Sequence, residues 1–338
     1  MHVLVTGAAG FVGSHLCEAL VARGDWVRGI DAFTTFYDPG RKEQNLTGLL
    51  DEPRFELVRA DLLDADLDSA LDDIDVVVNL AGEPGVTTSW GPSFAGYLER
   101  NVLATQRLIE ACVQRPVRRL VHASSSSVYG VDAGTLAARG EPRPASPYGV
   151  SKLAGEALVG AYARNFGLPS ISLRYFSVYG PRQRPDMAAH RFVEALLDGH
   201  PLVVYGDGTQ VRDFTYVADV VEATILATSA DVPAGAVLDV ASGRPVDVRT
   251  VIATLHRVAG TAEPSVDRRG ERPGDVPRTA GQIALTRACL GWTPRTDLAT
   301  GLANQVAWHR ARRGAAEPAL DPLPAVAAGA APSTGGSS

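Results

Sequence analysis

Short apolar runs alternate with helical patterns through the first half of the chain. The runs are rich in Val, Ile and Leu and nearly continuous, which is typical of strands that are buried on both faces of a parallel sheet. Helical patterns lie between them, most clearly at Leu98–Val113 and Pro147–Phe166, and Phe33–Pro53 is long enough to contain a short helix of its own. This alternation predicts an α/β fold, namely a doubly wound parallel sheet with right-handed crossovers. The predicted strands are His2–Thr6, Trp26–Ile30, Phe55–Arg59, Asp75–Leu80, Arg118–Ala123 and Ser170–Arg174.

After Gly180 the alternation becomes irregular. A helical pattern at Met187–Leu197 and a short strand at Leu202–Tyr205 predict a smaller α/β cap, whereas Val217–Ala227 and Val237–Val240 could return to the main sheet. The cap is then discontinuous in sequence. The predicted division is 1–178 plus 213–245 for the sheet domain, 179–212 plus 246–312 for the cap, and 313–338 for a disordered tail rich in Ala, Pro, Gly and Ser.

Composition narrows the possible classes of protein. The 338 residues carry a net charge of −6, which argues against a nucleic-acid surface. No apolar run reaches the roughly 18 residues that cross a bilayer, and the N-terminus lacks the basic region and cleavage site of a signal peptide. The three cysteines, Cys17, Cys112 and Cys289, form no CxxC or Cys/His cluster. We therefore expect a cytoplasmic protein with no metal site and no membrane partner.

A glycine-rich turn joins the first predicted strand to a helix. Gly7 permits the tight turn, Gly10 lets the backbone approach a pyrophosphate, and Gly13 allows the helix and strand to pack closely. The helix N-terminus offers free N–H groups to phosphate. A glycine turn without a ligand is the alternative interpretation. However, Asp31 ends the second strand 24 residues after Gly7, where an acid accepts hydrogen bonds from an adenosine ribose and repels a 2′-phosphate. The pattern predicts a Rossmann site for NAD rather than NADP.

Asp61, after the third strand, either reaches the adenine or caps the next helix. The residues expected to bind NAD are Gly7, Gly10, Phe11, Val12, Gly13, Asp31, Asp61, Leu62, Leu80, Ala81, Tyr148 and Lys152.

Tyr148 and Lys152 form the clearest catalytic candidate. Only two of the 32 basic residues are lysines, Lys42 and Lys152, so a lysine at 152 suggests a task that arginine cannot perform. Ser146 and Pro147 predict a helix start, which places Tyr148 and Lys152 on one helical face. A nearby ammonium, an oxidised nicotinamide and the helix N-terminus would each favour the phenolate. The alternative is a buried tyrosine beside a surface lysine.

Four consecutive serines, 124–127, follow the fifth predicted strand. Doubly wound sheets bind their ligands at this edge, so a serine here is a candidate third catalytic group, although the run could also be a simple turn.

Several motifs now resemble a known superfamily. The GxxGxxG spacing, ASSSSVYG, SPYGVSKLAGE, LRYFSVYGPRQRPDMA, VYGDG and RDFTYVADVV resemble the extended short-chain dehydrogenase/reductases, and among them the NAD-dependent nucleotide-sugar epimerases and dehydratases. The pieces DAFTTFYDPGRK and RPDMA are similar to UDP-glucuronate 4-epimerases. The resemblance covers the chain to about residue 312. It implies a homodimer that pairs through helices near 99–113 and 147–165.

The resemblance also implies a mechanism. Tyr148 takes the proton of the sugar 4-hydroxyl while hydride leaves C4 for NAD, the 4-keto sugar turns over, and both return on the opposite face. Lys152 bridges the nicotinamide ribose and Tyr148. Ser125, four residues before the tyrosine of the VYG motif, holds the substrate oxygen.

The same resemblance assigns the substrate pocket. Arg212 and Arg272 match positions that clamp a UDP diphosphate, Asp275 takes a ribose hydroxyl, and Arg184 pairs with a C6 carboxylate. Arg191 is either a second cation or an exposed helical arginine. The substrate candidates are Ser125, Ser126, Ser127, Tyr148, Ser177, Arg184, Arg191, Tyr205, Arg212, Arg272 and Asp275.

One position argues against two of the alternatives, and two departures from the family's pattern keep alternatives open. Ser127 stands where related dehydratases and decarboxylases carry Glu, which argues against dehydration and, less strongly, against decarboxylation. The segment Glu83-Pro84-Gly85-Val86-Thr87 replaces the usual Gln-x-Gly-Val-Arg, and Ser177 replaces the usual Thr. The alternatives are a UDP-glucuronate decarboxylase, a UDP-glucose 4-epimerase and, in another class, a non-catalytic NAD-binding sensor.

Overall fold

Seven parallel strands form the central sheet of the protein. The computed structural model describes residues 1–130 and 141–314. The strand order is β11-β6-β5-β4-β1-β2-β3, which is a doubly wound sheet whose direction of winding reverses between β1 and β4. The strands are β1 (His2–Thr6), β2 (Trp26–Asp31), β3 (Phe55–Arg59), β4 (Val76–Asn79), β5 (Arg119–Ser125), β6 (Ser170–Tyr175) and β11 (Ala236–Val240).

The predicted fold is confirmed, and each of the six strands predicted in the first half begins and ends within two residues of its expected bounds. The reason lies in their burial: in β4 every residue is buried, and in β5 all but Arg119 are. Val217–Ala227 returns to the sheet only as a covering helix, α9, whereas β11 joins the sheet beside β6.

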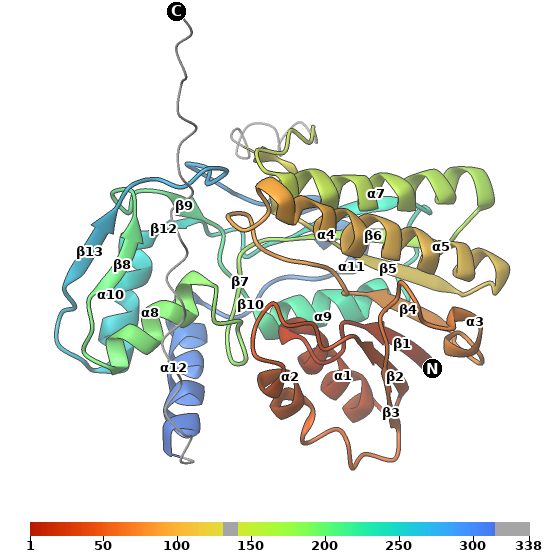
Figure 1. Cartoon of the computed structure of the whole chain (residues 1–338), viewed down its shortest axis with the longest axis horizontal. Coiled ribbons are helices and arrows are strands. Elements are labelled where there is room, and N and C mark those ends of the chain that lie inside the picture. Colours follow the sequence, from red (N-terminus) through yellow and green to blue (C-terminus); the bar gives the residue numbers. More distant parts are fainter. Residues whose placement is uncertain (131–140, 315–338) are drawn as a thin grey trace, which may run out of the picture.

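Helices cover both faces of the sheet (Figure 1). Successive side chains of a strand point to opposite faces, so Val3 and Val5 belong to one apolar core while Leu4 belongs to the other. The first core contains α1 (Phe11–Arg23), α2 (Pro39–Leu46), α9 (Val217–Ala227) and α11 (Ile283–Leu290). The second contains α3 (Leu67–Ala70), α5 (Ala104–Gln114) and α7 (Pro147–Phe166).

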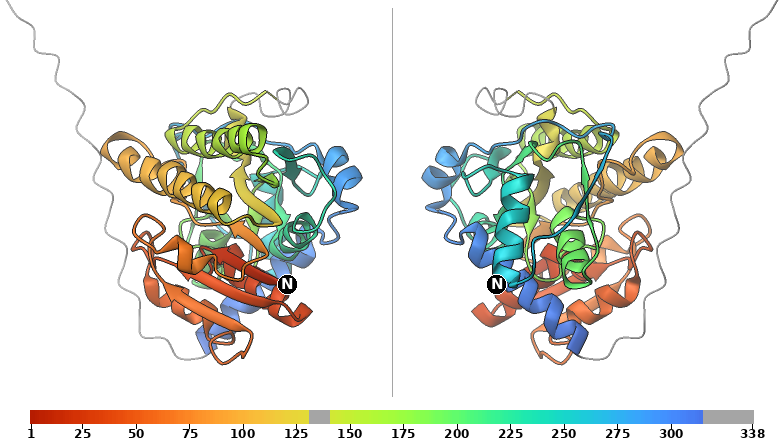
Figure 2. Two further views of the ribbon diagram at one scale, coloured as in Figure 1. Left: turned by 90° about the vertical axis from the view of Figure 1, so that its right-hand side faces the viewer. Right: turned by 90° about the vertical axis from the view of Figure 1, so that its left-hand side faces the viewer.

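A smaller cap lies beside the carboxyl edge of the sheet, at the left of Figure 1, and it faces the viewer in the right-hand view of Figure 2. It has its own apolar core, which includes Phe192, Val251 and Leu302. Its elements are α8 (Ala188–Leu197), β8 (Leu202–Tyr205), α10 (Val248–Ala259), β13 (Val266–Arg269) and α12 (Leu298–Gly314). Short pairs link it to the sheet domain, namely β7 (Val178–Tyr179) with β10 (Thr215–Tyr216) and β9 (Val211–Arg212) with β12 (Val246–Asp247).

The predicted boundary of the tail falls inside α12, because Arg313 and Gly314 still belong to that helix. The rest of the predicted tail lies outside the described residues, and the division into two domains stays a prediction. None of the helices in the described part of the chain combines the length and apolar character that a membrane span requires.

One predicted helix differs in detail. The segment expected as a single helix at Leu98–Val113 consists of α4 (Phe94–Leu98), a π-helical turn η2 (Glu99–Leu103) and α5. Asn101 in this turn is buried, and its side chain bonds to the backbone of Glu83 and to Ser151. These contacts accompany the wider turn, and such π-bulges are frequent at functional sites. Two 3₁₀ turns, η1 (Gly91–Ser93) and η3 (Ser126–Val128), complete the elements of the described residues.

Candidate active site

A cavity of about 610 Å³ lies between the carboxyl edge of the sheet and the cap. Ligands of doubly wound sheets bind at this edge, at the point where the strand order reverses. Every residue predicted to bind the cofactor or the substrate lines this cavity. The structure thus brings together candidates that are spread from Gly7 to Asp275, although their individual roles stay predictions.

The glycine turn fits a dinucleotide. Gly7 has a φ of +69°, and a Cβ atom there would lie 2.9 Å from the backbone nitrogen of Ala81. A Cβ atom on Gly13 would lie 2.1 Å from the carbonyl oxygen of Gly7, so only glycine permits this packing. Gly10 is the N-cap of α1 and offers no capping side chain, which leaves the first N–H groups of the helix available to a phosphate.

Asp31 ends β2 as predicted, but it has a partner that the sequence analysis did not assign. Its carboxylate accepts hydrogen bonds from the N–H groups of Ala9 (3.1 Å) and Phe33 (2.7 Å) and pairs with Lys42 Nζ (3.0 Å). Both charged side chains are at most 10% exposed. A carboxylate has about four acceptor positions, so capacity for a ribose hydroxyl remains. Lys42, the second lysine of the chain, reaches Asp31 from α2, and only its rarity could have drawn attention to it.

One of the two interpretations of Asp61 is wrong, because the N-cap of the next helix, α3, is Asp66 and not Asp61. Asp61 lines the cavity, and it also accepts from the N–H of Leu63 (3.1 Å) in the following turn. Its other oxygen lies 2.7 Å from Arg100 Nη1, and Arg100 Nε lies 3.7 Å from Glu83. Burial raises the pKa of Glu83, with Arg100, Lys42 and Arg184 acting in the opposite direction. The acid gained at position 83 therefore faces the pocket among cations.

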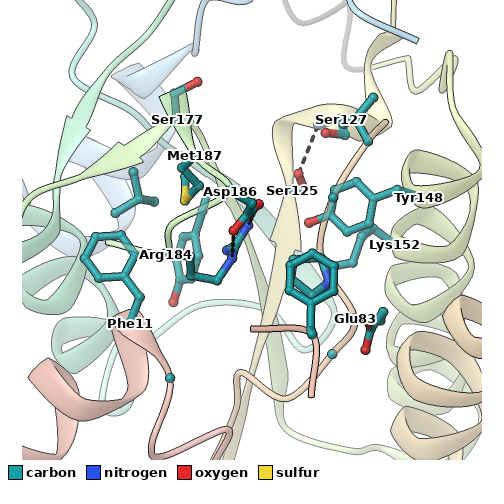
Figure 3. A pocket seen from close by; sticks show the side chains of 18 of the residues that line it. Phe11, Glu83, Ser125, Ser127, Tyr148, Lys152, Ser177, Arg184, Asp186 and Met187 are labelled. Carbon is teal, nitrogen blue, oxygen red and sulfur yellow. Dashed lines mark hydrogen bonds and ion pairs between the residues drawn. The ribbon is translucent and has the colours of Figure 1, made fainter. Parts of the chain in front are cut away.

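Tyr148 and Lys152 project from the first turns of α7 into the cavity, facing Ser125 (Figure 3). Ser146 caps this helix by accepting from Gly149 N–H at 3.1 Å, as expected. Lys152 is only 8% exposed, so the alternative of a surface lysine is wrong. Burial lowers the pKa of Lys152 to about 8, against the opposing effect of Glu156.

Burial also raises the pKa of Tyr148, while a hydrogen bond with Ser125 and the charge of Arg184 lower it. The sequence analysis assigned this stabilisation of the phenolate to Lys152 and to the nicotinamide. Among the protein's own groups, Ser125 and Arg184 oppose the effect of burial. Arg184 thus influences the tyrosine.

The serines at 124–127 have different partners. Ser125 Oγ accepts from the N–H of Ser127 at 3.1 Å, which holds its side chain at the start of η3. The hydroxyl of Ser124 instead donates to Glu156 at 2.7 Å. Ser126, Ser127 and Ser177 line the cavity. Ser125 is thus placed by a fixed turn beside Tyr148, which a serine catalyst requires.

A buried ionic network lies behind these groups and was not predicted. Arg174 Nε lies 2.9 Å from Glu156 and Arg174 Nη1 lies 2.6 Å from Tyr129 Oη, which in turn donates to Asp239 at 2.8 Å. These residues come from β5–η3, α7, β6 and β11. The only signal in the sequence is that Glu156 follows Lys152 by four residues on one helical face.

The substrate candidates of the predicted cap form three groups. Arg272 stacks over the ring of Tyr205, 3.2 Å from its centroid, and hydrogen bonds from Arg272 and Arg191 lower the pKa of Tyr205 against the effect of burial. Arg191 therefore lies in the pocket rather than on an exposed surface. Arg212 forms an ion pair with Asp275. Arg184 forms another with Asp186, a residue that was not predicted.

Comparison with known proteins agrees with this geometry. Residues 3–241 match the model of the NAD dependent epimerase/dehydratase family. The chain belongs to this family. Its fold is similar to a UDP-glucuronic acid 4-epimerase from Bacillus cereus, solved in complex with UDP-glucuronic acid and NAD, at 40% identity and a TM-score of 0.89 over 92% of this chain and 100% of that one.

Two further relatives extend the comparison. MoeE5, solved in complex with UDP-glucuronic acid and NAD, is 43% identical to this chain and has a TM-score of 0.83. The match covers 92% of this chain and 100% of that one. MoeE5 was also solved with UDP-glucose and NAD. An uncharacterised UDP-glucose epimerase of Bacillus subtilis is 40% identical over 91% of this chain and 98% of its own. Acidic and neutral sugars are thus both represented among the relatives.

Proposed function

We propose that the protein is an NAD-dependent UDP-glucuronate 4-epimerase that forms UDP-galacturonate through a 4-keto intermediate. The observation that carries this proposal is the placement of Arg184. Its guanidinium lies in the same cavity as Tyr148, Ser125 and Lys152 and is close enough to influence the pKa of the tyrosine. A cation there suits a sugar with a carboxylate beside its reacting carbon. The similarity to a UDP-glucuronic acid 4-epimerase supports the same substrate.

The chain's residues suit acid–base chemistry at the sugar 4-hydroxyl. Ser125 and Tyr148 together hold that hydroxyl, and Tyr148 Oη accepts its proton and later returns it. Lys152, with its pKa of about 8, holds a positive charge near neutral pH that favours the phenolate. NAD, when bound, would supply the acceptor for the hydride of C4 and its source for the return step. Gly7, Gly10, Gly13 and Asp31 would hold this cofactor.

The acidic substrate adds a constraint. A 4-keto uronic acid is a β-keto acid, which loses CO₂ when the bond to the carboxylate aligns with the carbonyl π system. Arg184 would hold the carboxylate out of this alignment. Ser126, Ser127 and Ser177 would complete the sugar pocket, while Arg191, Arg212 and Arg272 hold the UDP diphosphate and Tyr205 and Asp275 complete the UDP site.

Incubation with UDP-glucuronate tests the proposal. NMR detection of UDP-galacturonate supports it. A UDP-pentose or 4-keto-pentose points to the decarboxylase, and reaction of UDP-glucose alone points to the neutral-sugar epimerase. Tyr148→Phe distinguishes the remaining alternative: it should abolish turnover in an enzyme, whereas in a non-catalytic NAD-binding sensor it would leave function intact.

We further propose that the enzyme is a cytoplasmic homodimer. Four apolar side chains are exposed on the helices expected to pair, namely Leu98, Leu103, Val150 and Phe166, the last being 63% exposed. A subunit interface formed by these helices would bury these side chains. Light scattering during size-exclusion chromatography measures the mass, and Leu103→Glu should shift it to that of the monomer.

A further inference from the structure

Asp186 already occupies the guanidinium edge that a sugar carboxylate would need. Arg184 Nε lies 3.0 Å from Oδ1 of Asp186, and Nη2 lies 3.0 Å from Oδ2. This is the two-point geometry by which an arginine holds any carboxylate. Both side chains line the cavity, and Figure 3 shows them between Met187 on one side and Ser125 and Tyr148 on the other.

The ion pair is contained in a single turn. The N–H of Met187 donates to the carbonyl of Arg184 at 3.2 Å, and α8 begins directly afterwards at Ala188. Because the turn holds both groups, the carboxylate of Asp186 is present at a high local concentration beside Arg184. A carboxylate that enters from solution must displace it.

Within residues 1–130 and 141–314, no other acid forms an ion pair with Arg184. Its remaining neighbours are aromatic: the Phe36 ring centroid lies 5.9 Å from Arg184 Cζ, and Tyr37 and Tyr148 also favour its charge. Glu83 faces Arg184 from the other side of the pocket but makes no contact of ion-pair length with it. Asp186 is therefore the one strong partner of Arg184 among these residues. A substrate carboxylate would compete with it for the same guanidinium.

We propose that Asp186 competes within the protein for the guanidinium of Arg184 and so limits the preference of the pocket for acidic over neutral sugars. This inference rests on the proposed function. A sugar carboxylate replaces Asp186 on Arg184, and Asp186, whose side chain is 35% exposed, turns toward water. When a neutral sugar binds, the ion pair stays intact, so no desolvated guanidinium is left without a partner.

The test measures binding by calorimetry on the NAD-loaded protein. In Asp186→Asn we expect the Kd for UDP-glucuronate to fall about fivefold, which corresponds to roughly 1 kcal/mol for a partly exposed ion pair. The Kd for UDP, which lacks the sugar, should not change, and the Kd for UDP-glucose should stay the same or rise. Asp186→Ala should also lower the Kd for UDP-glucuronate. This variant is needed because the side-chain oxygen of an asparagine could still accept a hydrogen bond from Arg184.

Asp72→Asn is the matched control. It removes one negative charge from an exposed ion pair with Arg115, outside the cavity, and should change none of the three Kd values. An unchanged Kd for UDP-glucuronate in both Asp186 variants overturns the inference. A higher Kd for UDP-glucuronate in these variants overturns the inference too, because Asp186 would then orient Arg184 for the substrate. Turnover separates the two proposals: a shifted ratio of Kd values without epimerisation of UDP-glucuronate contradicts only the proposed function.

Discussion

Glu156 lies one helical turn beyond Lys152 on α7, where Arg174 and Ser124 hold its carboxylate. The lysine is buried, and Glu156 is the neighbour that keeps its pKa from falling further. Lysine must be protonated to favour the phenolate of Tyr148. The network behind the active site therefore helps to keep Lys152 protonated, although Glu156 is not expected to touch the substrate.

Glu156→Gln should lower the pKa of Lys152 below about 8 and move the upper limit of activity to lower pH. The pH profile of kcat for UDP-glucuronate epimerisation measures this shift. The variant should also be less stable, by roughly 3–5 kcal/mol, because Arg174 loses its buried partner. Glu56→Gln, in an exposed ion pair on β3, should leave the profile in place. An unshifted profile in folded Glu156→Gln would show that the network has only a structural role.

Lys152→Met should abolish epimerisation and yet stabilise the protein. Burial depresses the pKa of Lys152 from 10.5 to about 8, so below pH 8 the folded state holds a charge that burial disfavours. The expected gain at neutral pH is roughly 1–3 kcal/mol. Between these two pKa values the unfolded state binds more protons, so wild-type stability rises with pH and the advantage of methionine shrinks. Urea unfolding at several pH values measures both effects.

Lys42→Met is the control for this substitution, since it replaces the other lysine of the chain. Lys42 is also nearly buried, but it neutralises Asp31 at 3.0 Å. Its loss leaves a buried carboxylate without a counter-charge, so the variant should be destabilised. If Lys152→Met is instead destabilised to a similar degree, Lys152 is part of a stabilising ion pair rather than a disfavoured buried charge.

The surroundings of Lys42 and Lys152 show which features the sequence could predict and which it could not. Strand positions, the glycine turn and the Tyr148/Lys152 face follow from local composition and helical spacing, because burial on both faces of a sheet leaves a continuous apolar run. The partners of Asp31, Glu156 and Arg184 depend on how distant segments meet. Arg174 reaches Glu156 only because β6 lies beside β5, and no local pattern encodes that contact. Asp186 stood within the RPDMA motif, but nothing in the motif shows that its carboxylate turns back onto the arginine.

Gly13→Ala should prevent NAD binding. The added methyl would lie 2.1 Å from the carbonyl oxygen of Gly7, so α1 must move away from β1 and the phosphate turn with it. We expect purified protein without bound dinucleotide and a stability loss of about 2 kcal/mol or more, typical of overpacking. Gly48→Ala is the control, because nothing lies within 4 Å of its added methyl. Absorbance of the denatured supernatant measures retained NAD. Normal NAD content in Gly13→Ala would contradict this account of the turn.

The attachment of α12 to α8 should weaken in acid. Glu194 pairs with His309 and, at 2.8 Å, with Arg313, which also contacts Asp198. These partners hold the pKa of Glu194 at about 2 despite partial burial, against a usual value of 4.5. Its stabilising contribution is therefore present above pH 4.5 and is lost as the pH falls toward 2. His309 adds to this loss, because burial lowers its pKa and protonation then favours unfolding. Glu194→Gln should lower the Tm at neutral pH, and the difference from wild type should shrink as the pH drops through this window. A Tm difference that stays constant down to pH 2 would show that the glutamate stabilises the helix pair through packing rather than charge.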